Sequence, residues 1–195
     1  MDNGLISKIE CLVKNACYQK ENIFGCNIWE YHILPVVKYS KVLADRFCID
    51  KECAILSAYL HDYASVLDKK YYEEHHLYGA KFAEEILHRE NYPKQKIDII
   101  KTAILNHRGS IDYTEQSLEI KCLASADAMA HITEIPSLLY LAYRQKNMDI
   151  QTGSQWVYKK INRSWDKLCE EAKIIIRDEY QAGIKVLAIN DSNFP

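Results

Sequence analysis

The stretch YLHDY (residues 59–63) contains the end of an apolar run over residues 53–60, and such a run is typical of a buried helix. His61 and Asp62 are therefore expected at the inner end of a core helix. Burying an unpaired carboxylate costs several kcal/mol or forces the group to become neutral. A divalent metal removes that cost, because it binds a neutral imidazole and an ionised carboxylate together. The stretch predicts a helical fold whose other segments bring further ligands to this point.

The composition is that of an ordinary globular protein: 195 residues, 48% apolar and 27% charged, with a formal net charge of −2. No basic cluster is present, which disfavours a nucleic-acid partner. No apolar run approaches the ~20 residues that span a bilayer, and no secretory leader is visible, so we expect no membrane partner. The seven cysteines contain no Cys-x-x-Cys pair, which indicates reduced thiols and a cytoplasmic location. The oligomeric state stays open.

Apolar residues recur at helical spacing through nearly the whole chain, whereas strand-like alternation is rare. The expected fold class is therefore all-α. Asp50 is expected to be the N-cap of the third helix, and Gly109 is a natural stop for the fifth. Polar loops are expected at 67–74 and 148–153. The helices are predicted at about 5–18, 28–47, 50–62, 75–90, 93–108, 114–130, 133–145 and 154–182.

We expect a single domain over residues 1–195. A metal-binding core would span about 28–145, and a C-terminal helix with its tail, about 154–195, would pack on it. Gly183 would end that helix, and residues 184–189 would form a short strand or a docked extension.

Five consecutive predicted helices each carry a histidine or an aspartate, mostly at a helix end or on an apolar face. Antiparallel helices joined by short loops can bring such positions to one point of a bundle. Four imidazoles and two carboxylates are enough for two metal ions that share Asp62, with open positions left for water and substrate. The candidate ligands are His32, His61, Asp62, one of His75 and His76, His107 and Asp127.

The order and spacing of these residues resemble the HD-domain superfamily of metal-dependent phosphohydrolases, whose signature is His, then His-Asp, then Asp on a helical core. A two-metal subset adds a His four residues before a Gly-Ala or Ser-Ala step and a further His after it. His75 matches the first in the stretch HHLYGA (75–80), which favours it over His76, and His107 matches the second. The resemblance covers about residues 28–145. It implies an HD-domain-like helical bundle with two divalent metal ions, drawn from Fe, Mn, Zn, Co and Ni.

The chain departs from the family pattern in two places. His61-Asp62 is followed by YAS (63–65), where many relatives continue with Ile-Gly-Lys, so the lysine that could meet a phosphate there is absent. His107 is followed by Arg108 instead of a second histidine, and no Gly-Tyr-Pro comes after it. The second departure disfavours the cyclic-dinucleotide phosphodiesterase branch.

Several candidate ligands have an ordinary structural alternative. His32 could be a hydrogen-bonded core histidine, and His107 could interact with the dipole at a helix C-terminus. Asp127 could cap a neighbouring helix. Only the convergence of all these segments favours the metal-ligand interpretation over these alternatives.

Three further side chains have two possible roles or an ordinary surface role. Arg108 is either a phosphate-binding residue, because a guanidinium forks onto phosphate oxygens, or a surface arginine. His131, one turn after Asp127, either supports the ligands or is exposed, and His88 is expected at the surface.

The resemblance implies a hydrolase that acts on a nucleotide or another small phosphate ester. A metal-activated water would attack phosphorus in line. Asp62 would bridge the metals or orient the water, and Arg108 would stabilise charge on the phosphoryl oxygens. A di-iron oxygenase is an alternative, because the same imidazole-rich site suits iron. A catalytically silent sensory domain is a second alternative, and its mark would be eroded ligands, which are intact here.

Overall fold

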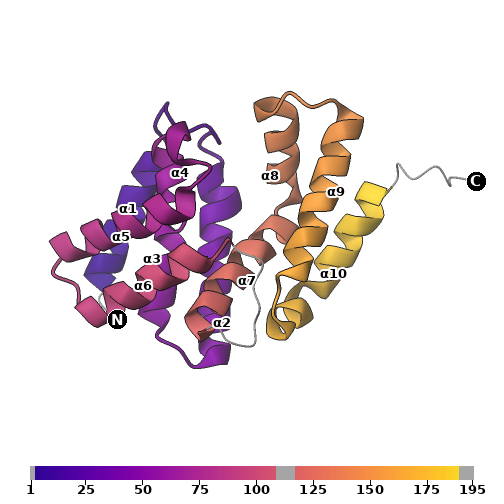
Figure 1. Cartoon of the computed structure of the whole chain (residues 1–195). Coiled ribbons are helices and arrows are strands. Elements are labelled where there is room, and N and C mark those ends of the chain that lie inside the picture. The colour runs from indigo at the N-terminus through magenta and orange to yellow at the C-terminus, as the bar shows by residue number, and fades with distance from the viewer. Residues whose placement is uncertain (1–2, 109–116, 189–195) are drawn as a thin grey trace, which may run out of the picture.

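The computed structural model describes residues 3–108 and 117–188, and every regular element in these two stretches is a helix (Figure 1). The predicted all-α fold class is therefore confirmed. No helix in the described ranges is long and apolar enough to cross a membrane. The elements are α1 (Asn3–Cys17), the π-helix η1 (Trp29–Ile33), α2 (Leu34–Phe47), α3 (Lys51–Leu60), α4 (Tyr63–Leu67), the 3₁₀-helix η2 (Lys69–Tyr71), α5 (His75–Arg89), α6 (Lys94–Asn106), α7 (Leu118–Thr133), α8 (Ile135–Tyr140), the π-helix η3 (Leu141–Gln145), α9 (Ile150–Asp166) and α10 (Glu170–Leu187).

Side-chain caps fix where the central helices begin. The Asp50 carboxylate accepts hydrogen bonds from the backbone N–H groups of Glu52 and Cys53, which confirms its predicted role as N-cap of α3. Ser117 caps α7 and Asp149 caps α9 in the same way. Each such cap is worth about 1 kcal/mol. Because the cap fixes the start of α3, it also fixes where the polar end of that helix falls.

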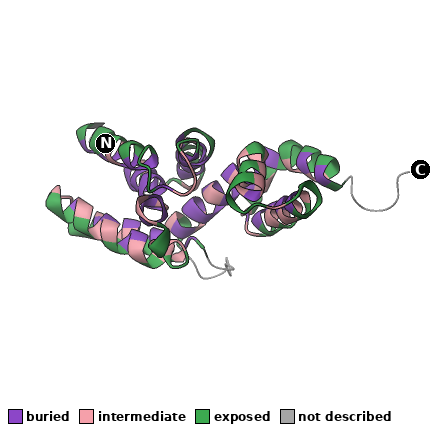
Figure 2. Ribbon diagram, turned by 90° about the horizontal axis from the view of Figure 1, so that it is seen from above, coloured by how far each residue is buried: buried purple, intermediate pink, exposed green. Residues whose placement is uncertain are grey.

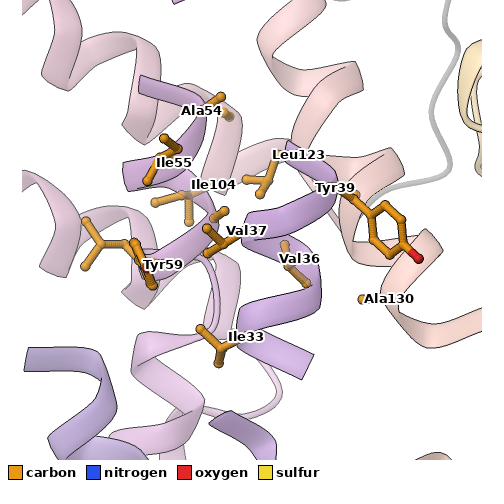
Figure 3. Packing of buried hydrophobic residues seen from close by; sticks show 14 of the residues in the cluster. Ile33, Val36, Val37, Tyr39, Ala54, Ile55, Tyr59, Ile104, Leu123 and Ala130 are labelled. Atoms are coloured by element: carbon orange, nitrogen blue, oxygen red, sulfur yellow. The ribbon is translucent and has the colours of Figure 1, made fainter. Parts of the chain in front are cut away.

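Helices α3 and α7 form the centre of the fold. Residues 52–60 of α3 are all buried, and α7 buries most of its length, so both helices are covered on nearly every side. Helix α2 packs against both, and α6 packs against α3, α5 and α7. Figure 2 shows the buried positions concentrated where the helices meet. In Figure 3, Val37 of α2, Ile55 of α3, Ile104 of α6 and Leu123 of α7 gather in one core.

The predicted helix over 28–47 has an unusual first turn, because residues 29–33 form the π-helix η1. Pro35 has no backbone N–H, so it cannot donate the α-helical hydrogen bond that the Tyr31 carbonyl would otherwise accept. A π turn lies at this position instead, and such turns are frequent at functional sites. His32 is buried within it.

The C-terminal segment differs from its prediction. One long helix was expected over 154–182, and this is wrong, because α9 ends at Asp166 and α10 begins at Glu170. The chain turns between them where Leu168 is buried in the core. The predicted loop over 148–153 is also too long, since α9 begins at Ile150. Helices α9 and α10 lie side by side and pack against α7 (Figure 1).

Gly183 does not end a helix, as the sequence suggested, but lies within α10. A Cβ at this position would come within 2.5 Å of the Cδ1 atom of Ile135. The absence of a side chain at Gly183 therefore lets Ile135 pack closely against α10. A strand or docked extension was predicted over 184–189. This is wrong for residues 184–187, which belong to α10. The expected helix stop at Gly109 and helix start at residue 114 lie outside the described residues.

The position of α7 at the centre of the fold leads to a stability prediction. Leu123→Ala should lower the free energy of unfolding by about 2–5 kcal/mol, because Leu123 is 2% exposed and its truncation leaves a cavity. Leu118→Ala removes the same atoms from the same helix at a position that is 42% exposed, and should cost about 1 kcal/mol or less. Guanidinium chloride denaturation measures both values, and equal losses would contradict the packing described.

Candidate metal centre

The candidate ligands meet at the inner end of α3. The Nε2 atom of His32 lies 3.3 Å from Nε2 of His61, which follows α3 directly. The same His32 atom lies 3.5 Å from Oδ1 of Asp127 in α7 and 3.3 Å from Oδ2 of Asp62. Side chains from η1, α7 and the end of α3 therefore converge on one point.

The two oxygens of the Asp62 carboxylate face different partners. Oδ2 is near His32, as described, whereas Oδ1 lies 3.4 Å from Nε2 of His75 at the start of α5. Two donor groups result, and within each the ligand atoms lie within 4.8 Å of one another: the first donor group is His32, His61 and Asp127, and the second donor group is Asp62, His75 and His107.

Three of the histidines are oriented in the same way. In each, the ring Nδ1 lies 2.6–2.8 Å from the backbone carbonyl oxygen of the residue three positions earlier. Because a carbonyl oxygen only accepts, Nδ1 carries the proton and Nε2 keeps its lone pair toward the centre. This is the outer hydrogen bond that metal-binding histidines commonly make. The pairs are His61 with Ala58, His75 with Tyr72, and His107 with Ile104.

Gly79 explains how α5 approaches the end of α3. A Cβ at this position would lie 3.0 Å from the carbonyl oxygen of His61 and 3.4 Å from Cγ2 of Ile104. Any larger residue would push α5 away from α3 and α6. Gly79, the glycine of the HHLYGA stretch, therefore allows the first turn of α5 to lie beside His61 and Asp62. His75 is the first residue of that turn and so lies near Asp62.

Both aspartates are held in the ionised form. Burial by itself would raise the pKa of Asp62, but neighbouring imidazoles, His61 first, hold that pKa well below its usual value. Burial likewise opposes ionisation of Asp127, and His131 is the largest of the influences that lower its pKa. Two half-buried carboxylates thus stay charged at neutral pH.

The histidines complement these charges. Burial lowers the pKa of His61, and burial together with His61 lowers the pKa of His107 to about 4. For His32, burial also acts to lower the pKa, but Asp62 and Asp127 outweigh it and the pKa is raised. The two carboxylates therefore favour positive charge at this point. Imidazoles with lowered pKa, such as His61 and His107, beside ionised carboxylates form a donor set that fits a divalent transition metal.

Two other histidines lie close to the centre. His76 belongs to neither donor group, and its buried Nδ1 has no hydrogen-bond partner in the part of the chain that the structure describes. The Nε2 atom of His131 lies 3.4 Å from Oδ1 of Asp127, and its ring stacks on His32 with 4.9 Å between centroids. Of its two predicted roles, the geometry favours support of the ligands.

A cavity of about 490 Å³ opens beside the two donor groups. Arg108 lies on its wall and donates a hydrogen bond to the Glu73 carbonyl oxygen. Lys160 of α9 also lines the cavity, and the sequence analysis missed it. It belongs to no motif and lies on a polar helix, so only the docking of α9 on α7 reveals its position.

The HD domain family matches residues 29–131, which is more than half of the chain. This match runs from the start of η1 to His131 and includes both donor groups. The chain therefore belongs to the HD-domain family.

Two individual proteins are also similar. An uncharacterized protein of Clostridium beijerinckii is 30% identical over 99 residues, which cover 50% of this chain and 62% of that protein. The match thus spans less than two thirds of the relative. A crystal structure of a predicted HD superfamily hydrolase from an uncultured Thermotogales bacterium superposes with a TM-score of 0.57 and 19% identity. That likeness covers 90% of this chain and 92% of the other, and it extends the shared fold to the C-terminal helices.

The two donor groups lead to a prediction about metal stoichiometry. His107→Ala should lower the metal content from about two ions to about one, because it removes a ligand of the second donor group and leaves the first intact. His76→Ala, at the neighbour of His75 that belongs to neither group, should leave the content unchanged. Elemental analysis of protein purified without chelators measures both, and equal metal content in wild type and His107→Ala would show that His107 is not a ligand.

Proposed function

We propose that this protein is a metal-dependent phosphohydrolase that uses two divalent metal ions to hydrolyse a nucleotide or another small phosphate ester. The observation that carries the proposal is the shared Asp62 carboxylate, whose oxygens face one donor group each. Membership of the HD-domain family supports it. A pair of metals bridged by a carboxylate lowers the pKa of a bound water and stabilises charge on the phosphoryl oxygens.

The residues of the chain have separate roles in this proposal. The first donor group would hold one ion and the second donor group the other, and Asp62 would be common to both. Asp62 stays ionised because of the surrounding imidazoles, so it can orient the attacking water by accepting its hydrogen bond. Arg108 lies on the cavity wall, and within residues 3–108 and 117–188 one of its five N–H donors is used, by the Glu73 carbonyl oxygen. The remaining donors can bind phosphoryl oxygens.

The size and lining of the cavity support a small organic phosphate. About 490 Å³ accommodates a ligand of nucleotide size. Aromatic rings offer flat, apolar surfaces on which a nucleobase can stack. The aromatic residues that line the cavity are Phe24, Tyr31, Tyr72, Tyr140 and Trp156.

We also propose that the metal-binding core over 28–145 and the C-terminal segment over 154–195 form one domain. Two observations support this. Helices α9 and α10 pack against α7, and the cavity wall combines Asp62 from the core with Trp156 and Lys160 from α9.

Activity and metal should be lost together when a central ligand is removed. His61→Ala and Asp62→Ala should lower the metal content and abolish phosphate release while circular dichroism shows that the helices remain, because α3 and α7 bury enough apolar surface without an ion. His88→Ala, at an exposed histidine of α5, is the matched control and should behave as wild type.

The measurement is phosphate release from a panel of nucleotides and simple phosphate esters in the presence of Mn²⁺, Zn²⁺, Co²⁺ or Fe²⁺. Wild type that hydrolyses none of them, and that instead consumes oxygen with bound iron, would favour the oxygenase alternative. Unfolded variants would show that the metal is structural.

The aromatic lining predicts how substrates are distinguished. Tyr31→Leu should raise KM for a nucleoside monophosphate about two- to tenfold, because it removes one stacking surface, and should leave KM for glycerol phosphate unchanged. Tyr18→Leu is the control, since Tyr18 is 53% exposed, similar to the 46% of Tyr31, but does not line the cavity. Steady-state kinetics measure both, and equal effects on the two substrates would argue against a nucleobase at Tyr31.

A further inference from the structure

We propose that Lys160 of α9 is an anion-binding residue of the active-site cavity, and that it binds a phosphate group of the substrate. The substrate assignment rests on the proposed function, whereas anion binding can be measured without turnover. The inference adds a residue from the C-terminal helices to a site whose metal ligands all come from residues 32–127.

The first observation is the position of Lys160. Its side chain lines the same cavity as Asp62, Asp127 and His131. Burial lowers the pKa of its ammonium group, and Asp127 is the strongest of the charges that oppose this. Lys160 in turn contributes to lowering the pKa of His131. Lys160 therefore lies on the wall of the cavity into which candidate metal ligands also face.

The second observation is that the ammonium group of Lys160 has no hydrogen bond or ion pair within the part of the chain that the structure describes. Within residues 3–108 and 117–188, no hydrogen bond or ion pair joins its ammonium to another group, although a lysine offers three donors. Two other half-buried lysines do have acidic partners: Lys96 lies 2.9 Å from Asp50 and 3.1 Å from Glu52, and Lys101 lies 2.6 Å from a carboxylate of α5. A half-buried ammonium without an acceptor is costly, so a ligand that supplies an acceptor would be bound favourably.

The charge of the cavity indicates which ligand this is. Among the described residues, its wall carries three cationic side chains, Arg108, Lys160 and Lys167. The Lys167 ammonium already donates to the Arg108 carbonyl oxygen at 3.1 Å, which links the end of α9 to the end of α6. With divalent ions bound by Asp62 and Asp127, the cavity would have an excess of positive charge and would attract an anion. A lysine is a common point-charge contact for phosphate.

A purely structural role is the competing explanation. Lys160 could act only as a distant counter-charge to Asp127. In that case the removal of Lys160 would disturb the metal centre. If Lys160 binds an anion instead, its removal would leave the metals in place. Metal content therefore separates the two roles.

The test uses inorganic phosphate as the probe and the metal-loaded full-length protein, with binding measured by calorimetry. Lys160→Met should raise the Kd for phosphate about ten- to hundredfold, because it removes a charge-assisted hydrogen bond. Lys160→Arg should retain most of the affinity. Lys159→Met is the matched control, since Lys159 is the adjacent residue, is exposed and does not line the cavity. It should bind phosphate as wild type does, and all variants should keep the wild-type metal content.

Three results would overturn the inference: wild type that binds no phosphate, Lys160→Met that binds it as tightly as wild type, or Lys160→Met that loses metal. The proposed function fails separately, when wild type hydrolyses no phosphate ester. If phosphate binding still depends on Lys160 in that case, the anion site stands and only the reaction assigned to it is wrong.

Discussion

The half-buried carboxylate of Asp62 is the constraint on which the rest of the site depends. It follows a helix whose residues 52–60 are all buried, and a charge in that position needs partners on more than one side. Imidazoles supply them at 3.3 Å and 3.4 Å, from His32 and His75. To bring these rings together, η1 and α5 must both reach the end of α3. The π turn before Pro35 and the close approach at Gly79 are found where this is required.

Much of this arrangement could be predicted because the signals are local. Helical periodicity gave the all-α class, and a capping aspartate at Asp50 marked the start of α3. Polar residues beside long apolar runs marked the candidate ligands, and the structure brings all six of them together. The spacing in HHLYGA favoured His75 over His76. The structure shows why this spacing matters: Gly79 lets α5 approach the end of α3, and His75, four residues earlier, then faces Asp62.

The parts that could not be predicted depend on contacts between distant segments. The turn between α9 and α10 occurs where Leu168 is buried against the core, and no Gly or Pro marks it. Gly183 resembles a helix stop in the sequence, yet in the structure it makes room for Ile135. Lys160 is one lysine among several on a polar helix, and only the packing of α9 against α7 places it on the cavity wall.

The most direct test of the account is anomalous diffraction from crystals of protein purified without chelators and supplied with Mn²⁺. We expect two metal peaks about 3.5–4 Å apart, one within the first donor group and one within the second, with Asp62 between them. A single peak away from Asp62, or no peak at either donor group, would contradict it.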